Sequence, residues 1–195
     1  MRIFSTFPDQ DGGSFGNGVL YFYTAEEDNN GDVWVGTSAG PIILSNLSNI
    51  MKSNYRCTRV KVPRNDGTNY ADYLLEDESV NDIVVDGANR KWLATSSSGL
   101  YLVNENGTEI LENHTTDNSI IPSNLIYDMD MDDATGELFI ATDKGVASYR
   151  SDVSEVAEDY NDVVVFPNPV RPDYTGWITV QGLMDNSLVK ITDVA

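Results

Sequence analysis

This sequence is poor in the residues that build metal centres and covalent cross-links. It has one cysteine, Cys57, and one histidine, His114. A single cysteine cannot form an intramolecular disulfide, and this pair cannot supply a zinc cluster of cysteine and histidine ligands. A Ser-His-Asp triad would have to use His114, which lies in a polar stretch that we interpret as a loop. The sequence therefore predicts no cofactor and no catalytic residue of these kinds.

Basic residues and long apolar runs are also scarce. The chain has 12 Lys and Arg against 31 Asp and Glu, which gives a net charge of -19. Such a surface repels nucleic acids and anionic membranes. No apolar run approaches the roughly 20 residues of a membrane helix, and Met1–Ser5 lack the apolar core of a signal peptide. We expect no nucleic-acid partner and no membrane insertion. If the protein is exported, we expect this chain to be a piece of a longer precursor.

What the sequence does contain is one phrase repeated three times. In each copy an Asp (Asp28, Asp86, Asp133) precedes an aromatic residue by six positions, a Thr follows the aromatic by three, and a Gly closes the phrase. The aromatic residues are 58 and then 47 residues apart. A repeat of roughly 40 to 50 residues with several short strands is typical of a propeller blade. The repeated positions are Trp34, Thr37 and Gly40, then Trp92, Thr95 and Gly99, then Phe139, Thr142 and Gly145.

The second copy shows the blade most clearly. Alternating apolar residues predict four antiparallel strands over 80–85, 91–95, 100–103 and 108–111, and Asn89 takes the place of glycine in the first turn. The first copy predicts strands over 20–25, 33–37 and 42–44 and a fourth near 57–62. The third predicts strands over 126–131, 138–142 and 146–149, and residues 2–7 resemble a lone fourth strand. Trp34, Trp92 and Phe139 are expected to be buried between adjacent blades.

The fold class that follows is all-β. Residues 1–150 are expected to form about three blades of four antiparallel strands, too few to close a ring. They are thus a fragment of a larger propeller, or they self-associate through uncovered faces. The stretch 151–162 carries five acids and no basic residue and is interpreted as a linker. Residues 163–195 contain the alternating runs 177–180 and 188–192, which predict the beginning of a truncated β-sandwich.

The blade phrase resembles the two-component regulator propeller repeat. That resemblance covers residues 1 to about 150 and includes the lead-in Ile121–Ile126. The stretch Phe166–Val170, with Gly182, Leu183 and Asp193, resembles the C-terminal sandwich of the Por (type IX) secretion system. Together they imply a non-catalytic scaffold or binding module of an exported protein of a Gram-negative bacterium, accessory to type IX secretion at the outer-membrane surface. The alternative is a periplasmic ligand-sensing domain of a hybrid histidine kinase. The partner implied is a protein or a glycan.

One group of acidic residues is a candidate metal site. Asp128, Asp130 and Asp132 alternate along one expected strand, so they project from one face. Three carboxylates can hold Ca²⁺, which prefers oxygen ligands. The simpler interpretation is a strand whose acids are hydrated. An enzyme that works with two carboxylates, as glycosidases do, also stays open.

Overall fold

A computed structural model describes residues 7–15, 21–64, 67–68, 70–150, 163–171, 173–183 and 187–190. The chain divides into two compact units, Met1–Ser154 and Glu155–Ala195. The regular structure of the described residues is all-β, apart from one turn of 3-10 helix, η1 (Leu47–Asn49). The predicted fold class is thus confirmed. The expected linker over 151–162 and the expected strand over residues 2–6 lie outside the described residues.

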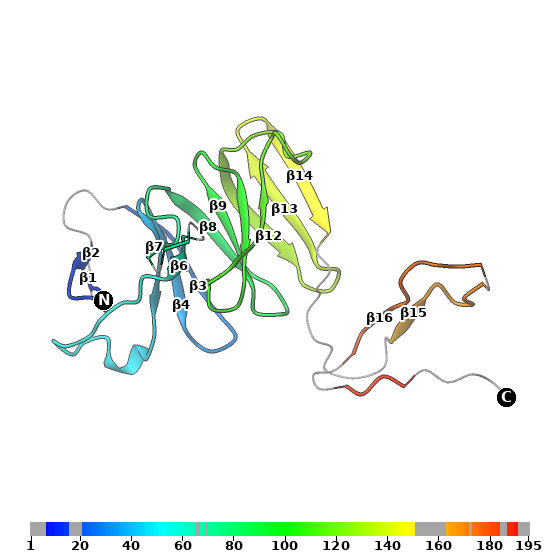
Figure 1. The fold of residues 1–195 in the computed structure, drawn as a ribbon, viewed down its shortest axis with the longest axis horizontal. Coiled ribbons are helices and arrows are strands. Elements are labelled where there is room, and N and C mark those ends of the chain that lie inside the picture. Colours follow the sequence, from blue (N-terminus) through cyan, green and yellow to red (C-terminus); the bar gives the residue numbers. More distant parts are fainter. Residues whose placement is uncertain are drawn as a thin grey trace. The chain divides into compact units, whose positions relative to one another are not determined.

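Three antiparallel sheets stacked face to face form the body of the first unit, and together they make a partial β-propeller (Figure 1). Each sheet corresponds to one copy of the repeated phrase, and the first strands of the three sheets lie side by side. The first sheet contains β3 (Phe22–Glu27), β4 (Val33–Thr37) and β5 (Gly40–Leu44). The second contains β8 (Val80–Val85), β9 (Lys91–Thr95), β10 (Leu100–Val103) and β11 (Ile110–His114). The third contains β12 (Ile126–Asp132), β13 (Glu137–Thr142) and β14 (Gly145–Arg150).

The repeated Asp closes the turn between the first two strands of each blade. Its Oδ1 accepts a hydrogen bond from the N–H two residues later, at 2.9 Å for Asp28, 3.0 Å for Asp86 and 3.1 Å for Asp132. In the third blade this residue is Asp132, where the sequence spacing pointed to Asp133. The third turn is one residue longer, and two adjacent Asp residues hide that insertion. Asn89 adopts a φ of 60°, as expected for a residue in the place of glycine.

The repeated Thr and Gly form the next turn. The Thr Oγ1 donates to the Gly carbonyl oxygen, at 2.7 Å both for Thr95 to Gly99 and for Thr142 to Gly145, and Thr37 bonds Gly40 likewise. The Thr Oγ1 also accepts a hydrogen bond from a backbone N–H inside each turn. These glycines have positive φ, where a Cβ is strained. The repeat therefore preserves a turn structure.

Apolar packing between blades forms the core. Trp34 and Ile43 of the first blade pack against Val80, Ile83 and Leu93 of the second. One repeat later, Trp92 and Leu102 pack against Met129, Leu138 and Ile140 of the third blade. Asp82 also connects the three sheets: it accepts hydrogen bonds from Thr24 of the first blade at 3.0 Å and from the Met129 N–H of the third at 2.7 Å.

The fourth strands differ from the prediction. In the second blade the fourth strand is Ile110–His114, later than the expected 108–111, because the loop after Val103 is longer than a two-residue turn. In the first blade, a single antiparallel bridge between Ile43 and Thr58 takes the place of the expected fourth strand. Pro41, the next residue along the same edge of β5, has no N–H and cannot extend that pairing. The chain instead forms a separate hairpin of β6 (Lys61–Pro63) and β7 (Ala71–Tyr73).

A short hairpin of β1 (Phe7–Pro8) and β2 (Ser14–Phe15) lies beside this region. It is attached to the first blade by backbone pairing, since the Cys57 N–H donates to the Pro8 carbonyl at 3.0 Å. The side chain of Gln10 adds a second attachment: it bonds both the N–H and the C=O of Arg59, at 2.9 and 2.8 Å. The hairpin therefore fixes the backbone of the segment that diverges from the first blade.

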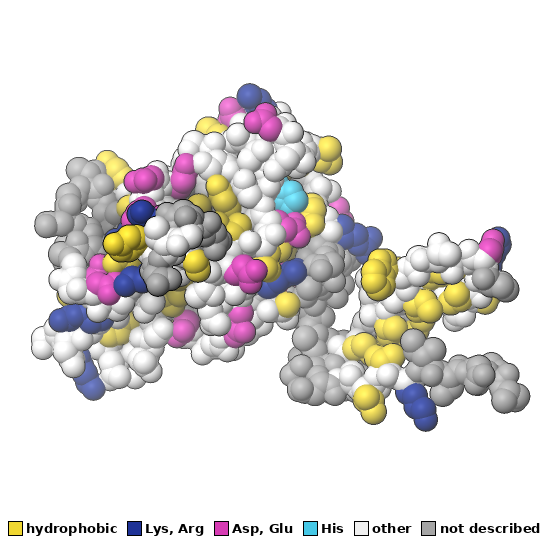
Figure 2. All heavy atoms as spheres, viewed as in Figure 1, with side chains coloured by type: hydrophobic (Ala, Val, Ile, Leu, Met, Phe, Trp, Pro, Cys, Tyr) yellow, Lys and Arg dark blue, Asp and Glu magenta, His cyan; other side chains and the backbone are white. Residues whose placement is uncertain are grey.

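The second unit contains one antiparallel pair, β15 (Val164–Phe166) and β16 (Thr179–Gln181). Residues 187–190 have no strand, which corrects that part of the strand expected over 188–192; residues 191 and 192 lie outside the described part. Apolar side chains gather on this unit (Figure 2), and Trp177 is 91% exposed. A two-stranded sheet cannot bury two faces, which explains this exposure. The sandwich itself stays a prediction.

Candidate functional site

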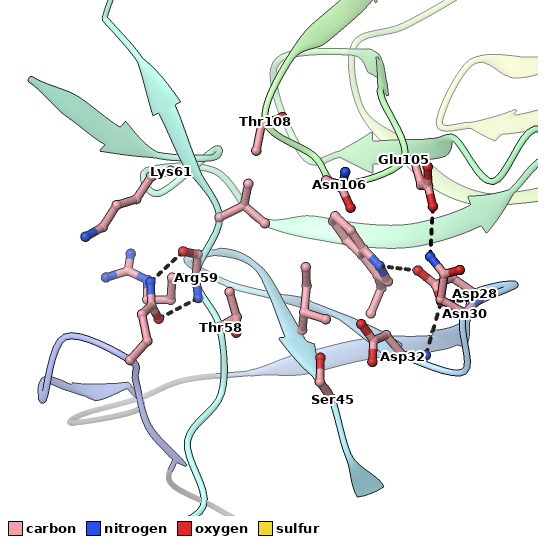
Figure 3. Close-up of a pocket in the computed structure, with 14 residues that line it drawn as sticks. Asp28, Asn30, Asp32, Ser45, Thr58, Arg59, Lys61, Glu105, Asn106 and Thr108 are labelled. Carbon is pink, nitrogen blue, oxygen red and sulfur yellow. Dashed lines mark hydrogen bonds between the residues drawn. The ribbon is translucent and has the colours of Figure 1, made fainter. Parts of the chain in front are cut away.

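A cavity of about 460 Å³ opens between the first and second blades (Figure 3). Its floor is apolar and consists of Trp34, Ile43 and Val60. The loop after β10 covers it from the second blade: a Cβ on Gly107 would lie 2.7 Å from the Trp34 ring, so only glycine fits there. The polar residues of the rim are Gln10, Asp28, Asn30, Asp32, Ser45, Thr58, Arg59, Lys61, Glu105, Asn106 and Thr108.

A buried ion pair joins the two blades behind this floor. The Lys91 Nζ, fully buried, lies 2.8 Å from Asp28 Oδ2 and donates to the carbonyl oxygens of Asn89 and Glu105, both at 2.8 Å. It also lies 5.0 Å from the centroid of the Trp34 ring. The Lys91 ammonium is thus bound on all sides, as a buried charge must be.

The Asp28 carboxylate is likewise fully hydrogen-bonded. It accepts from Trp34 Nε1 at 3.1 Å, from Lys91, and from the N–H groups of Asn30 and Asp32. Burial raises the pKa of Asp28, but the hydrogen bonds from Lys91 and the two N–H groups outweigh it, so the pKa is lowered overall. Asp28 is therefore a structural carboxylate that stays ionised.

Charged residues lie at both ends of the cavity rim (Figure 3). Asp32 and Glu105 lie on one side, and hydrogen bonds from Asn30 and Asn89 lower the pKa of Glu105. Arg59 and Lys61 lie on the other. Arg59 stacks 3.7 Å from the centroid of the Tyr73 ring, and Lys61 pairs with Asp11 at 2.8 Å. The charged ends of Arg59 and Lys61 therefore contact Tyr73 and Asp11, which do not line the cavity.

The structure places the repeated aromatic residues at equivalent points of the three blades. Trp34 and Trp92 are buried between blades, whereas Phe139 is 44% exposed. The expected burial of Phe139 is therefore wrong. The face of the third sheet that carries Phe139 has no further blade upon it within the described residues. The other repeated residues, Thr37, Gly40, Thr95, Gly99, Thr142 and Gly145, form the turns described above and do not line the cavity.

The carboxylates of Asp128, Asp130 and Asp132 are exposed along β12. Across the ladder they face Ala141, Phe139 and Glu137 of β13, respectively. In the part of the chain that the structure describes, no three His, Cys, Asp or Glu side chains come together as metal ligands. The candidate calcium site is not formed there, because side chains two apart on a strand run parallel and do not converge.

His114 lies in a cluster between the second and third blades. Its ring is stacked on Trp92, with centroids 6.1 Å apart, and its Nε2 lies 2.7 Å from Glu112 Oε2. Tyr149 closes the cluster, donating to the same Glu112 oxygen at 3.2 Å. We expected His114 in a loop, but it ends β11 and packs between blades.

Apart from Asp28 and Trp34, which belong to the repeat, the residues around the cavity could not be identified from the sequence. Lys91, Asp32, Arg59 and Glu105 come from separate segments that only blade stacking brings together. One signal was present: Lys91 occupies the position that Val33 and Leu138 hold in the other blades. A charge at an otherwise aliphatic position of a repeat indicates a buried partner.

The stacked sheets with a repeated turn and aromatic residue define a β-propeller type of protein. No protein-family model and no curated protein matches the chain. Among solved structures the chain is similar to PorZ of Porphyromonas gingivalis, described as an essential bacterial surface component of the type IX secretion system. Identity is 31% and the TM-score 0.70, over 92% of this chain and 24% of PorZ. The predicted resemblance is confirmed, and the chain spans about a quarter of the length of PorZ.

A more distant likeness is to the extracellular domain of a putative one-component system from B. thetaiotaomicron. It has 16% identity and a TM-score of 0.52, over 72% of this chain and 18% of that one. This likeness shows the fold alone. Its 72% of 195 residues, about 140, is less than the 154 residues of the first unit, whereas the PorZ match of 92%, about 179 residues, exceeds them. The likeness to PorZ therefore extends into the second unit.

Among the described residues, no helix has the length and apolar character needed to cross a bilayer.

Proposed function

We propose that this chain is a non-catalytic binding and scaffold module of an exported protein that acts in type IX secretion at the bacterial surface. The observation that carries the proposal is the likeness to PorZ, which includes residues of both units at 31% identity. A propeller likeness alone would fit many functions, because propellers host unrelated activities. The combination of this propeller with this second unit is more specific.

A binding role fits the chemistry of the cavity. Asp28, a carboxylate of its rim, already accepts four hydrogen bonds and has a lowered pKa. A general acid must hold a proton near neutral pH, and a general base needs a free lone pair. Asp28 offers neither and is structural; the open, partly apolar cavity beside it supports a role in recognition of a protein or glycan partner.

The acidic surface is consistent with a protein that stays soluble outside the cell. Figure 2 shows acidic side chains spread over the visible face of the first unit, without a single dense patch. Mutual repulsion of such surfaces limits non-specific association, and it also repels anionic polymers and lipids. Specific partners then have to be recognised through local features such as the interblade cavity.

The proposal is tested in the bacterium that encodes the protein. An epitope tag on the full-length protein should be digested by protease added to intact cells, and deletion of the gene should remove type IX cargo from the cell surface. Complementation with the intact gene is the control. The competing function is that of an extracellular sensor domain, which the fold likeness to the one-component system favours. A protected tag, with normal cargo but altered transcription of a ligand-responsive locus, would support the sensor and refute the secretion role.

A further inference from the structure

Charges of opposite sign are segregated along this chain. Residues 33–65 contain no acid and five basic residues, which are Lys52, Arg56, Arg59, Lys61 and Arg64. Residues 92–143 contain ten acids and no Lys or Arg. The basic stretch includes the segment after β5, which covers the outer face of the first blade, and the acidic stretch includes β12 and β13 of the third. In Figure 1 the sheet of β13 and β14 lies at one end of the stack of blades, and β6 and β7 lie at the other.

Two cations at the first end of the stack are available to a partner. The other three basic residues are already paired, as Arg59–Glu76, Lys61–Asp11 and Arg64–Asp72. Lys52 and Arg56 are exposed and have no acidic partner among the described residues; the Arg56 guanidinium donates to the Tyr55 carbonyl oxygen at 2.9 Å. In the same loop, Leu47 and Met51 are 36% and 51% exposed. We call Leu47, Met51, Lys52 and Arg56 the basic patch.

The outer face of the third blade has a complementary composition. Phe139 and Val146 on this face are 44% and 71% exposed. Asp130 lies directly opposite Phe139 in the ladder, and Asp128 lies opposite Ala141, which pairs in turn with Val146. Residues opposite each other in a ladder share one face of the sheet. Asp128 and Asp130 are exposed, and neither forms an ion pair within the part of the chain that the structure describes. The face thus combines apolar area with two carboxylates that lack a cation.

Charge determines which surface of a second copy fits this face. An isologous contact joins the same surface of both copies, so Asp128 and Asp130 of one chain would meet those of the other and repel them. A heterologous contact joins two different surfaces, and the basic patch supplies both opposite charge and exposed apolar side chains. The blades already pack with this polarity inside the chain, since Asp28 of the first blade pairs with Lys91 of the second at 2.8 Å.

We propose that the outer face of the third blade binds the basic patch of a second copy, so that copies of this chain associate head to tail. The exposed apolar side chains of the two surfaces pack together, and the two carboxylates of the face lie near the two cations of the patch. After one such contact, the pair still has one open face and one open patch. Further copies can therefore add until the assembly closes on itself.

Variants that block one surface each test the polarity of the contact. Phe139→Lys blocks the face, and the double variant Lys52→Glu with Arg56→Glu blocks the basic patch. In sedimentation velocity at concentrations on the order of 100 µM, we expect each variant alone to associate at least about tenfold more weakly than the wild type. An equimolar mixture should form a heterodimer, because the patch of the first variant and the face of the second are both intact. A patch variant that associates like the wild type, or a mixture that stays monomeric, overturns the proposal.

Two further variants guard against effects on folding and on net charge. Val146→Lys lies at a more exposed position of the same face, so it should act as Phe139→Lys does with an unchanged thermal unfolding midpoint. The control for the patch is Arg171→Glu with Lys190→Glu, which makes the same change of charge at exposed residues of the second unit. We expect no effect of this control on association. An equal loss in the control and in the patch variant would show that net charge matters and the patch does not.

Salt distinguishes the two modes of contact independently of the variants. Ions screen the attraction between patch and face, so raising NaCl from about 50 to about 500 mM should weaken wild-type association at least about fivefold. Screening favours contact between two acidic faces, so association that strengthens with salt would overturn the proposal. A wild-type chain that stays monomeric throughout also overturns it. All of these measurements use the purified chain, so they are independent of the secretion assay.

Discussion

Lys91 of the second blade and Asp28 of the first form an ion pair with 2.8 Å between Nζ and Oδ2, although 63 residues separate them in sequence. Both side chains are almost completely buried. Desolvation of two charges is unfavourable, and only good geometry with additional hydrogen bonds compensates for it. Here the additional bonds come from Trp34, Asn89 and Glu105, so the pair fixes one blade against the next.

Replacing Lys91 with methionine should therefore destabilise the chain strongly. The substitution leaves the Asp28 carboxylate buried without its cation, and the loss of one partner of a buried pair typically costs about 3 to 5 kcal/mol. Urea denaturation followed by far-UV circular dichroism measures the change. The control is Lys144→Met in an exposed turn, where we expect less than about 0.5 kcal/mol. Similar values for both variants would show that the pair contributes no net stability.

The same pair should make stability depend on pH. The Asp28 pKa is lowered from its ordinary value of 3.8, so its contribution is fully present above that pH and is lost as pH falls through the folded-state pKa. In Lys91→Met the hydrogen bond that most strongly lowers this pKa is gone and burial raises it. The difference in unfolding free energy between the wild type and Lys91→Met should thus be largest above pH 4 and should narrow below it. A difference that is constant from pH 3 to 7 would contradict this.

The blades could be predicted from sequence because their signals are local. A turn Asp, a buried aromatic and a Thr–Gly pair lie within about a dozen residues of one another, and each acts through neighbours in its own sheet. The spacing predicted the wrong turn residue in the third blade, because it could not reveal a one-residue insertion in that turn. Asp132, one residue before the expected Asp133, closes the turn. The prediction of a fourth strand in the first blade was wrong for another local reason, because Pro41 lacks the N–H that would extend the pairing.

The cavity could not be predicted in this way. Its walls come from the turn after β3, the strand that diverges after Thr58 and the loop after β10, and only the stacking of blades brings them together. Phe139 shows the same limit of prediction from sequence. Its sequence position equals that of Trp34 and Trp92, yet its burial depends on whether another blade covers it.

Trp34 and Trp92 should differ in their tolerance to phenylalanine. Both indoles are buried at equivalent positions, but Trp34 Nε1 donates to Asp28, whereas Trp92 Nε1 has no acceptor within the described residues. Each substitution removes similar volume, and only Trp34→Phe also removes a hydrogen bond to a charged group, worth roughly 1.5 to 3 kcal/mol. We expect Trp34→Phe to be more destabilising by about that amount in urea denaturation. Equal losses would indicate that the bond to Asp28 is energetically neutral.

The uncovered face of the third blade should drive self-association of this chain. Phe139 is 44% exposed and Val146 71% exposed on a sheet whose counterparts in the other blades are covered. Burying about 100 Å² of Phe139 at roughly 25 cal/mol per Å² contributes about 2.5 kcal/mol, or about sixtyfold in a dissociation constant. Sedimentation at micromolar concentration should show oligomers that Phe139→Lys weakens.

The matched control for this prediction is Ile110→Lys on the edge strand β11. Ile110 is about as exposed as Phe139, at 43%, but lies on a different blade. If association depends on exposed apolar area in general, both lysines weaken it alike. If association depends on stacking of one blade on another, only Phe139→Lys weakens it, because blade stacking buries the repeat position that Phe139 shares with Trp34 and Trp92. A wild-type chain that sediments as a monomer at these concentrations would show that this face does not drive association.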